Sequence, residues 1–322
     1  MSTSRPESRG DEDPFTALRP RLFGIAYGIT GSVADAEDVC QDTWMRWQSI
    51  DMASVEAPEG YLVRLVSNGA IDRLRSAKVR RATYVGPYLP EPLLTEISDT
   101  SLEAAERADE LTYAFLVMLD ELSPVERVVI LLHDVFGYTF DEVARTVDRP
   151  VAGCRQMASR SRRRLQGHER RALRGPDERK LVDQLIVATI RGDVEAMMTL
   201  LADNVVQIDD GGAKQRAARH PVVGRERVAR FIVNLAKRLE ADVAISHIRV
   251  NGSPGLLLTK SGAVWLVFVF DFDADGLLER VYAQVNPDKL GHLQPTRAAT
   301  VEREARPRMG YNLQQISRGP RL

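Results

Sequence analysis

The chain has 322 residues, of which 44% are hydrophobic and 28% charged, and its formal net charge is -1. This length predicts two or three domains of roughly 100–150 residues each. The longest apolar run, residues 263–270, is far shorter than the ~20 residues that cross a bilayer. Residues 1–14 lack the apolar core of a secretory signal peptide, and two cysteines cannot build a disulfide framework. We therefore expect a globular protein in the cytoplasm, with no membrane partner.

Charge is arranged in blocks that the near-zero total hides. Residues 60–81 carry six cations and one acid, and residues 149–174 carry nine arginines and one acid. Between them, residues 91–110 carry seven acids and one cation. Two basic blocks with an acidic spacer are typical of nucleic-acid contacts on two modules, although solvated helix faces explain most charge runs. The one-sided block at 149–174 favours a polyanionic partner.

Apolar residues recur at helical spacing through the first part of the chain, and no segment there alternates between apolar and polar residues. The predicted helices cover residues 15–30, 33–48 and 61–79. After a flexible segment at 1–14, residues 15–83 are therefore predicted to form an all-α bundle.

Residues 84–100 (YVGPYLPEPLLTEISDT) form a proline-containing linker. Proline fixes the backbone angle φ and lacks an amide donor, so an extended segment is predicted rather than a helix. The segment is too apolar for a free tether, and we expect it to dock on another part of the protein.

Two capping boxes mark helix starts further along, Ser-Pro-Val-Glu at 123–126 and Thr-Phe-Asp-Glu at 139–142. Helices are expected to resume at Leu102, within a second all-α domain at 101–174. Its later helices are predicted over 124–135, 140–147 and 151–167. Two short helices, a tight polar turn and an arginine-rich helix are typical of a helix-turn-helix.

The last third of the chain changes in character. A long helix at about 178–201 leads into strands separated by glycine-bearing turns, with another helix at about 225–239. The predicted strands cover 205–208, 244–250, 255–259, 263–273 and 278–285. This pattern predicts an α+β domain with an antiparallel sheet at 178–292. The tail at 293–322 is rich in Pro, Arg and Gln and is predicted to be flexible.

The helical parts resemble a known family. LRPRLFGIAYGITGSVADAEDVCQDTWMRW (18–47) followed by GYLVRLVSNGAIDRLR (60–75) resembles region two of sigma-70 factors, most closely the extracytoplasmic-function (ECF) class. LDELSPVERVVILLHDVFGYTFDEVARTV (119–147) with SRSRRRL (159–165) resembles region four. The resemblance implies a sigma factor that binds core RNA polymerase, recognises the −10 and −35 promoter elements and initiates transcription. It implies no catalysis and no cofactor.

The remainder resembles SnoaL-like domains of the NTF2-like fold, a cone-shaped α+β domain with a pocket. The matching segments are GDVEAMMTLLADNVVQIDDGG (192–212) and HPVVGRERVARFI (220–232). A subgroup of ECF factors carries such a domain in place of a separate anti-sigma protein. That subgroup shares the YVGPYLPEP-type linker (84–92), a DGG-x-K motif (210–214) and an NPDKL motif (286–290), all present here.

The resemblance implies intramolecular control, in which both motifs dock against the linker and the two DNA-binding modules. Tethering favours such contacts, because a linked partner is present at roughly millimolar effective concentration. Ala213 stands where the family pattern has glycine, which puts the backbone of the loop in question. The residues assigned to this contact are Tyr88, Pro90, Glu91, Pro92, Asp210, Gly211, Gly212, Lys214, Asn286, Pro287, Asp288 and Lys289.

The resemblance assigns the helix at 33–48 to the β′ clamp of polymerase and region four to the β flap. The polymerase-binding candidates are Asp35, Glu37, Asp38, Gln41, Asp42 and Trp44. An ordinary solvated face is the alternative interpretation of the acids, and both Trp44 and Trp47 are compatible with the bundle core.

The helix at 61–79 is assigned to the −10 element, where cations contact phosphates and a pocket receives an extruded base. The candidates are Arg64, Asn68, Asp72, Arg73, Arg75 and Lys78. Asp72 is also placed to orient Arg75 through a local ion pair.

The recognition helix is expected to meet base edges at its N-terminal part. Arg155 and Gln156 are the candidates, because Arg pairs with guanine and Gln with adenine in the major groove. Cys154 is interpreted as a small packed residue rather than a redox switch. The expected phosphate contacts are Arg149, Arg160, Arg162, Arg163 and Arg164.

The role of the C-terminal domain is the most open question. The five histidines have no metal-ligand spacing, so no metal site is expected. The resemblance leaves open a small ligand in the pocket, and the candidate lining is Asp209, Asp210, His220, His247, Trp265 and Tyr282. Two alternatives are a ligand-responsive helix-turn-helix regulator without polymerase and a SnoaL-type enzyme with a helical appendage.

Overall fold

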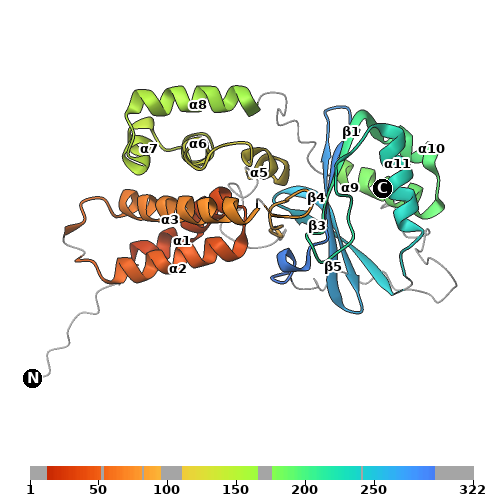
Figure 1. Ribbon diagram of the computed structural model, residues 1–322, viewed down its shortest axis with the longest axis horizontal. Coiled ribbons are helices and arrows are strands. Elements are labelled where there is room, and N and C mark those ends of the chain that lie inside the picture. The colour runs from red at the N-terminus through yellow and green to blue at the C-terminus, as the bar shows by residue number, and fades with distance from the viewer. Residues whose placement is uncertain are drawn as a thin grey trace, which may run out of the picture. The chain divides into compact units, whose positions relative to one another are not determined.

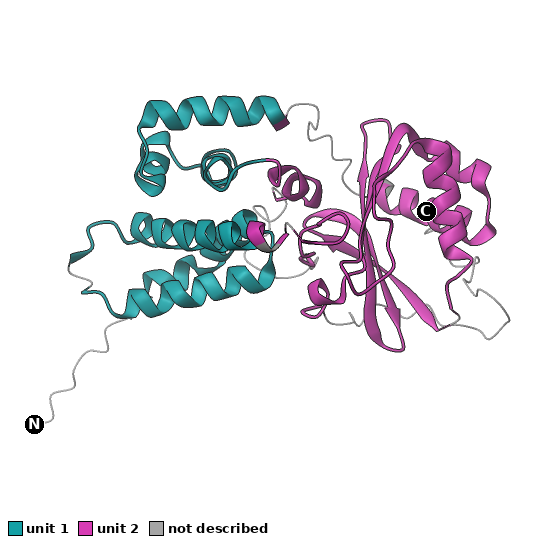
Figure 2. Ribbon diagram, viewed as in Figure 1, with its two compact units in different colours: residues 1–77, 122–164 teal, residues 78–121, 165–322 magenta. Residues whose placement is uncertain are grey.

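The computed structural model describes residues 13–51, 54–81, 83–95, 111–165, 176–240 and 242–293. The chain divides into two compact units, shown in different colours in Figure 2. Unit 1 combines residues 1–77 with 122–164, and unit 2 combines residues 78–121 with 165–322. Within the described ranges, none of the helices is long and apolar enough to cross a membrane. The expected flexible tail at 293–322, except for its first residue, and the expected helical residues 102–110 lie outside the described residues.

The first half of unit 1 is the predicted helical bundle (Figure 1). Its helices are α1 (Pro14–Thr30), α2 (Val33–Gln48) and α3 (Pro58–Arg81). Asp13 caps α1 by accepting the amide of Thr16 at 3.1 Å, so this helix begins at Pro14, one residue before the predicted start. Gly31, with φ of 68°, ends α1, and the Ser32 side chain then caps α2.

The second half of unit 1 carries the helix-turn-helix. Both predicted capping boxes form, at Ser123 with Glu126 and at Thr139 with Glu142. The expected single helix over 124–135 is instead an α-helical segment that continues as a π-helical turn. The elements are α6 (Pro124–Ile130), η2 (Leu131–Val135), α7 (Phe140–Val147) and α8 (Val151–Leu165).

The two helical parts of unit 1 pack together through buried polar contacts. Arg127, on α6, is 2% exposed and donates to the carbonyl of Ile29 near the end of α1 at 2.8 Å. Arg21, on α1, donates to the carbonyl of Phe136 at 2.9 Å. The Phe136 ring lies against Gly24, where a Cβ atom would be 3.4 Å away. Neither arginine stood out in the sequence, because each binds a backbone carbonyl far along the chain.

Unit 2 is built on a six-stranded sheet with strand order β2-β1-β6-β5-β4-β3. The strands are β1 (Leu201–Asp210), β2 (Val222–Val223), β3 (Val243–Val250), β4 (Ser253–Lys260), β5 (Ala263–Phe272) and β6 (Leu278–Gln284). The prediction of an antiparallel sheet is wrong at one pair, because β1 and β6 run parallel. A parallel pair needs a long crossover, and the chain between β1 and β6 supplies it. The two-residue strand β2 was too short to predict.

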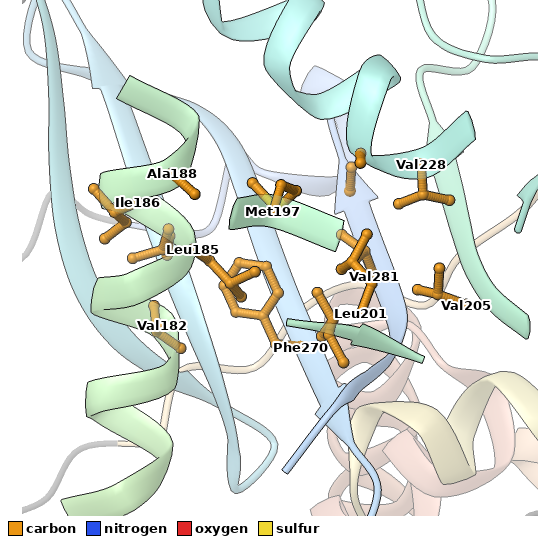
Figure 3. Close-up of a cluster of buried hydrophobic side chains, with 14 of the residues drawn as sticks. Val182, Leu185, Ile186, Ala188, Met197, Leu201, Val205, Val228, Phe270 and Val281 are labelled. Carbon is orange, nitrogen blue, oxygen red and sulfur yellow. The ribbon is translucent and has the colours of Figure 1, made fainter. Parts of the chain in front are cut away.

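One face of this sheet is covered by helices α9 (Pro176–Arg191), α10 (Val194–Thr199) and α11 (Arg225–Ala236). The predicted long helix at 178–201 is divided at Gly192, with φ of 69°, and Asp193 caps α10. Figure 3 shows Leu185 of α9 next to Phe270 in the buried core between helices and sheet. The predicted fold class, two helical modules followed by an α+β domain, is confirmed.

The other face of the sheet is covered by three segments distant in sequence. These are the linker residues 84–95, helix α5 (Tyr113–Leu119) and the short 3-10 helix η3 (Pro287–Lys289). Leu89 and Tyr113, both 0% exposed, pack there with Val250 and Tyr282. The linker and the start of the second helical module are thereby part of the same core as the sheet.

Candidate functional site

A buried ion pair lies where the linker crosses the sheet. Lys289 Nζ is 2.7 Å from Asp210 Oδ2, and their side chains are 6% and 0% exposed. Lys289 also donates to the carbonyl of Leu89 and lies 3.1 Å from the ring centroid of Tyr88. Burial lowers the pKa of Lys289 to about 8, while the Asp210 carboxylate opposes that shift. The ammonium is therefore charged at pH 7.

Asp210 receives enough donors to stabilise a buried carboxylate. Its oxygens accept from the Leu89 amide at 2.9 Å, the Tyr84 hydroxyl at 2.5 Å and the Gly212 amide at 3.1 Å. Burial, together with the bond to Asp210, raises the pKa of Tyr84, so that its phenol keeps its proton and donates. Two linker residues thus bind the same carboxylate as Lys289.

The two glycines of the DGG-x-K motif allow this close approach. A Cβ atom on Gly211 would be 2.6 Å from the carbonyl oxygen of Gln215. Gly212 has φ of +56°, and a Cβ atom there would be 2.8 Å from Asn286 Nδ2. Among the described non-glycine residues, only Asp148, Asn251 and Ser261 have positive φ. Ala213 therefore adopts an ordinary backbone conformation, and the missing glycine of the family pattern does not disturb the loop.

The NPDKL motif completes the junction from the other side. Asn286 donates from Nδ2 to the Tyr84 hydroxyl at 2.8 Å, and its Oδ1 accepts the Asp288 amide at 3.1 Å. A second ion pair joins the two motifs at the surface, Lys214 with Asp288 at 2.5 Å, and these side chains are 61% and 60% exposed. The same two motifs are thus linked by one buried and one exposed pair. We use the name linker junction for the two linker residues Tyr84 and Leu89 together with the residues of these two pairs, Asp210, Lys214, Asp288 and Lys289.

Beyond the linker junction, the chain adds a short bridge to the edge of the sheet. Leu94 pairs antiparallel with Val250 on β3, where the Thr95 amide donates to the Arg249 carbonyl at 3.0 Å. The Asn251 amide donates to the Leu93 carbonyl at 2.9 Å. Such pairing uses the open hydrogen-bonding edge of the outer strand. Residues 84–95 are therefore bound along the sheet, as their apolar composition predicted.

The two helices that flank the linker, α3 and α5, also meet at their C-terminal ends within unit 2. Arg81, at the end of α3, pairs with Asp120, just after α5, at 2.8 Å, and their side chains are 13% and 40% exposed. The Arg81 guanidinium lies 3.5 Å from the ring centroid of Tyr88. Tyr113, at the start of α5, donates its hydroxyl to the Pro90 carbonyl at 2.8 Å. The linker between α3 and α5 is therefore closed at its ends and anchored in its middle.

In unit 1 the predicted polymerase-binding acids form a largely exposed face of α2. Two arginines flank this face, Arg19 of α1 and Arg73 of α3. Glu37 pairs with Arg19 of α1 at 2.8 Å. Trp44 is half-buried and packs on the Phe15 ring, with centroids 4.9 Å apart. Trp47 is buried and donates to Asp13 at 2.9 Å, so it belongs to the bundle core.

The predicted −10 residues divide between two sides of α3. Arg64, Asn68, Asp72 and Arg75 form one exposed stripe, in which Arg75 and Asp72 make the expected local pair at 3.3 Å. Arg73 is turned toward α2 instead, which the sequence did not indicate. Lys78, near the C-terminal end of the helix, is half-buried.

The arginines of α8 also divide into two groups. Arg162 makes two hydrogen bonds to Asp134, at 2.9 and 2.5 Å, and Arg164 lies 3.4 Å from Glu126. Glu126 lies in α6 and Asp134 in η2, so these arginines anchor α8 to that segment. The remaining candidates of this helix and its turn are exposed, namely Arg149, Arg155, Gln156, Arg160 and Arg163. Cys154 is buried, as expected for a packed residue, and burial raises the pKa of its thiol.

The six residues expected to line one pocket of the C-terminal domain do not come together. Asp210 and Tyr282 lie on the face covered by the linker, whereas Trp265 packs in the core beneath the helices. His247 pairs with Asp183 of α9 at 3.0 Å, and His220 is exposed. Asp209 points away from Asp210, since adjacent strand residues face opposite sides. No group of three or more potential metal-binding His, Cys, Asp or Glu residues occurs in the described part of the chain.

Comparison with known proteins decides the family. Residues 15–80 match Sigma-70 region 2, and residues 113–165 match Sigma-70, region 4. The ECF RNA polymerase sigma factor SigJ of Mycobacterium tuberculosis is 38% identical over 227 residues, which cover 70% of this chain and 72% of that protein. The chain belongs to the ECF RNA polymerase sigma factors.

Other relatives extend the match through the C-terminal domain. The probable ECF RNA polymerase sigma factor SigI of M. tuberculosis is 28% identical over 296 residues, covering 88% of this chain and 97% of that protein. The crystal structure of M. tuberculosis SigJ has a TM-score of 0.70 at 31% identity, and covers 86% of this chain and 97% of that chain. The match to region 2 includes the acidic helix α2 and the basic helix α3. A DNA-binding regulator that works without polymerase gives no reason for these two helices.

Several residues in and around this sigma factor's linker junction were missed by sequence reasoning. Tyr84 and Leu89 were quoted within the linker motif but not assigned to the contact, and Tyr113 and Gln284 were not singled out. Gln284 donates to the Pro90 carbonyl at 3.3 Å and lies at the buried end of strand β6. A buried amide in such a strand is a usable signal, because it needs a partner.

Proposed function

We propose that this sigma factor is controlled by its own C-terminal domain, which keeps the linker between regions two and four folded. The observation that carries the proposal is the buried Lys289–Asp210 pair, to which the linker contributes the Tyr84 hydroxyl and the Leu89 amide. Because the restraining domain is part of the chain, no separate anti-sigma protein is required.

The reach of the linker supports this mechanism. Elements at −10 and −35 lie about 25 base pairs apart, or about 85 Å at 3.4 Å per base pair. Residues 82–112 span about 100 Å when fully extended. In the structure the helices that flank this segment, α3 and α5, are joined at their C-terminal ends by the 2.8 Å contact of Arg81 with Asp120. Only after the linker leaves the sheet could the modules on either side engage both elements.

The packing within unit 1 is a second, independent restraint, because it holds the helix-turn-helix part against the first helical bundle. Arg127 and Arg21 join the helix-turn-helix part to α1 through backbone carbonyls, and Tyr138 donates its hydroxyl to Glu59 at 2.9 Å. About 120 residues packed as one body have a radius of gyration near 14 Å, which is small against the distance between the elements. Promoter engagement therefore requires these contacts to separate as well.

We assign the partners by surface chemistry. The acidic face of α2 is proposed to bind a basic surface of the polymerase β′ clamp, and region four to bind the β flap. The exposed stripe of α3 is proposed to bind the −10 element. At the −35 element, Arg155 and Gln156 are proposed to contact base edges, and Arg149, Arg160 and Arg163 to contact phosphates.

The first test is co-migration of the purified chain with core RNA polymerase. A variant with Asp35→Asn, Glu37→Gln and Asp38→Asn is expected to lose binding. A matched control changes three exposed acids of the sheet domain, Asp203→Asn, Glu226→Gln and Asp275→Asn, and is expected to bind like the unmodified chain. Equal binding by all three proteins would remove the acidic face of α2 from the proposal.

A further inference from the structure

Arg73 lies on the border between the two surfaces of region two. Helix α2 approaches α3 closely at Gly69, where a Cβ atom would be 3.3 Å from Val39 Cγ1. One helical turn later, the Arg73 guanidinium meets three carboxylates of α2. Its nitrogens are 3.0 Å from Asp38, 3.5 Å from Asp42 and 3.7 Å from Asp35.

These contacts join residues that were assigned to different partners. The three acids belong to the polymerase-binding face, and Arg73 belongs to the basic helix assigned to the −10 element. The neighbouring Arg75 differs, since its partner Asp72 lies on its own helix. Arg73 is thus a cation of the basic helix that forms its ion pairs with the acidic face of α2.

Arg73 and two of its three acids are well exposed to a competing partner, and the third acid is partly exposed. Arg73 is 37% exposed, Asp38 and Asp42 are both 54% exposed, and Asp35 is 22% exposed. Exposed ion pairs are weak and exchange readily with other charges. A basic polymerase surface that reaches the acids therefore competes directly with the Arg73 guanidinium.

We infer that Arg73 couples polymerase binding to promoter binding by exchanging partners. This inference rests on the proposed function of the acidic face of α2. In the isolated sigma factor, the carboxylates hold the guanidinium away from DNA. When polymerase cations take the carboxylates, Arg73 becomes available to a phosphate of the −10 region. Coupling of this kind is reciprocal, so the acids that bind polymerase also control access to DNA.

The test uses the full chain with Arg73→Gln, and Arg75→Gln as the control with the same charge change. Arg73→Gln is expected to bind core polymerase about 3- to 10-fold more tightly, because its acids are no longer occupied. The holoenzyme it forms is expected to bind promoter DNA more weakly, by a similar factor. Arg75→Gln is expected to weaken promoter binding and leave core affinity unchanged. A purely structural link between α2 and α3 predicts no gain in core affinity.

A double-mutant cycle separates partner exchange from a general change in charge. Asp38→Asn is expected to cost more core affinity in the Arg73→Gln background than in the unmodified chain, since Asp38 is then fully available. Additive effects would overturn the inference, as would weaker or unchanged core binding by Arg73→Gln. If the triple acid variant still binds core polymerase, the proposed function fails. If the triple acid variant loses core binding but Arg73→Gln binds core polymerase no more tightly than the unmodified chain, the proposed function stands and only the exchange of partners fails.

Discussion

The two units of this sigma factor use ion pairs in opposite ways. In unit 1, Arg73 and Asp38 are 37% and 54% exposed, whereas in unit 2 Lys289 and Asp210 are 6% and 0% exposed. An exposed pair contributes about 0–1 kcal/mol and can exchange partners. Removing one member of a buried pair typically costs about 3–5 kcal/mol, because a charge stays behind without its partner. The pair on the face proposed to bind polymerase is thus exchangeable, whereas the attachment of the linker carries a buried pair.

The largest expected effect breaks the buried pair at the linker junction. Lys289→Met leaves the Asp210 carboxylate buried without its cation, which should lower the free energy of opening by about 3–5 kcal/mol. Lys214→Met removes the exposed pair between the same two motifs and should cost less than about 1 kcal/mol. Hydrogen exchange of the linker and of strands β1 and β6 measures both. Equal protection in the two variants would contradict the contrast between buried and exposed pairs.

A second buried cation tests the packing within unit 1. Arg127→Met leaves the Ile29 carbonyl without its donor, and should destabilise the contact between α6 and α1 by about 2–3 kcal/mol. Arg145→Met changes an exposed arginine of α7 and serves as the control. Faster amide exchange at the end of α1 in the first variant alone is the expected result. Unchanged exchange would mean that Arg127 does not hold the two helical parts together.

Asp271 on β5 gives a prediction with a definite pH dependence. Burial, reinforced by nearby Glu279, raises its pKa to about 6, above the ordinary value of 3.8. A raised carboxyl pKa contributes stability that is present below the unfolded pKa and is lost as pH rises through 6. Asp271→Asn should therefore stabilise unit 2 by about 1–2 kcal/mol at pH 7.5 and much less at pH 4.5. Thermal unfolding at both pH values, with the exposed Asp275→Asn as control, checks the sign.

The smallest expected effects come from single arginine substitutions in α8, where an arginine held by Asp134 is compared with one that is exposed. Arg163→Ala removes an exposed cation, and should shallow the salt dependence of DNA binding by about 1. Arg162→Ala removes the bonds to Asp134, so it should shallow that slope less and destabilise α8 by up to about 1 kcal/mol. Promoter-binding titrations at several salt concentrations compare the two. Identical slopes would show that the contact with Asp134 does not withhold Arg162 from DNA.

Local patterns in the sequence predicted the helix-turn-helix well. The capping boxes at Ser123 and Thr139 depend on residues only three positions apart, and both form. The break between α9 and α10 was also encoded locally, by Gly192 and Asp193, and was overlooked. The family motifs indicated Asp210 and Lys289, although not that they pair with each other.

Contacts between distant segments could not be predicted in the same way. The bonds of Tyr84 to Asp210 and of Arg127 to Ile29 join residues far apart along the chain. Nothing in the spacing of either partner identifies the other, because tertiary packing brings them together. The parallel pairing of β1 with β6 was missed for the same reason, since each strand alone reads like a member of an antiparallel sheet. Arg73 was assigned correctly to a basic helix, but which side of that helix it occupies depends on where α2 packs.

The central claim is that the linker junction restrains the sigma factor, and run-off transcription tests it most directly. Core polymerase would be supplied with the full chain, with Lys289→Met or with Lys214→Met, on a template that carries both promoter elements. Releasing the linker removes one of the two restraints on regions two and four, so Lys289→Met is predicted to raise transcript yield several-fold, while Lys214→Met matches the unmodified chain. An unchanged or reduced yield from Lys289→Met, with core binding intact, would contradict the account.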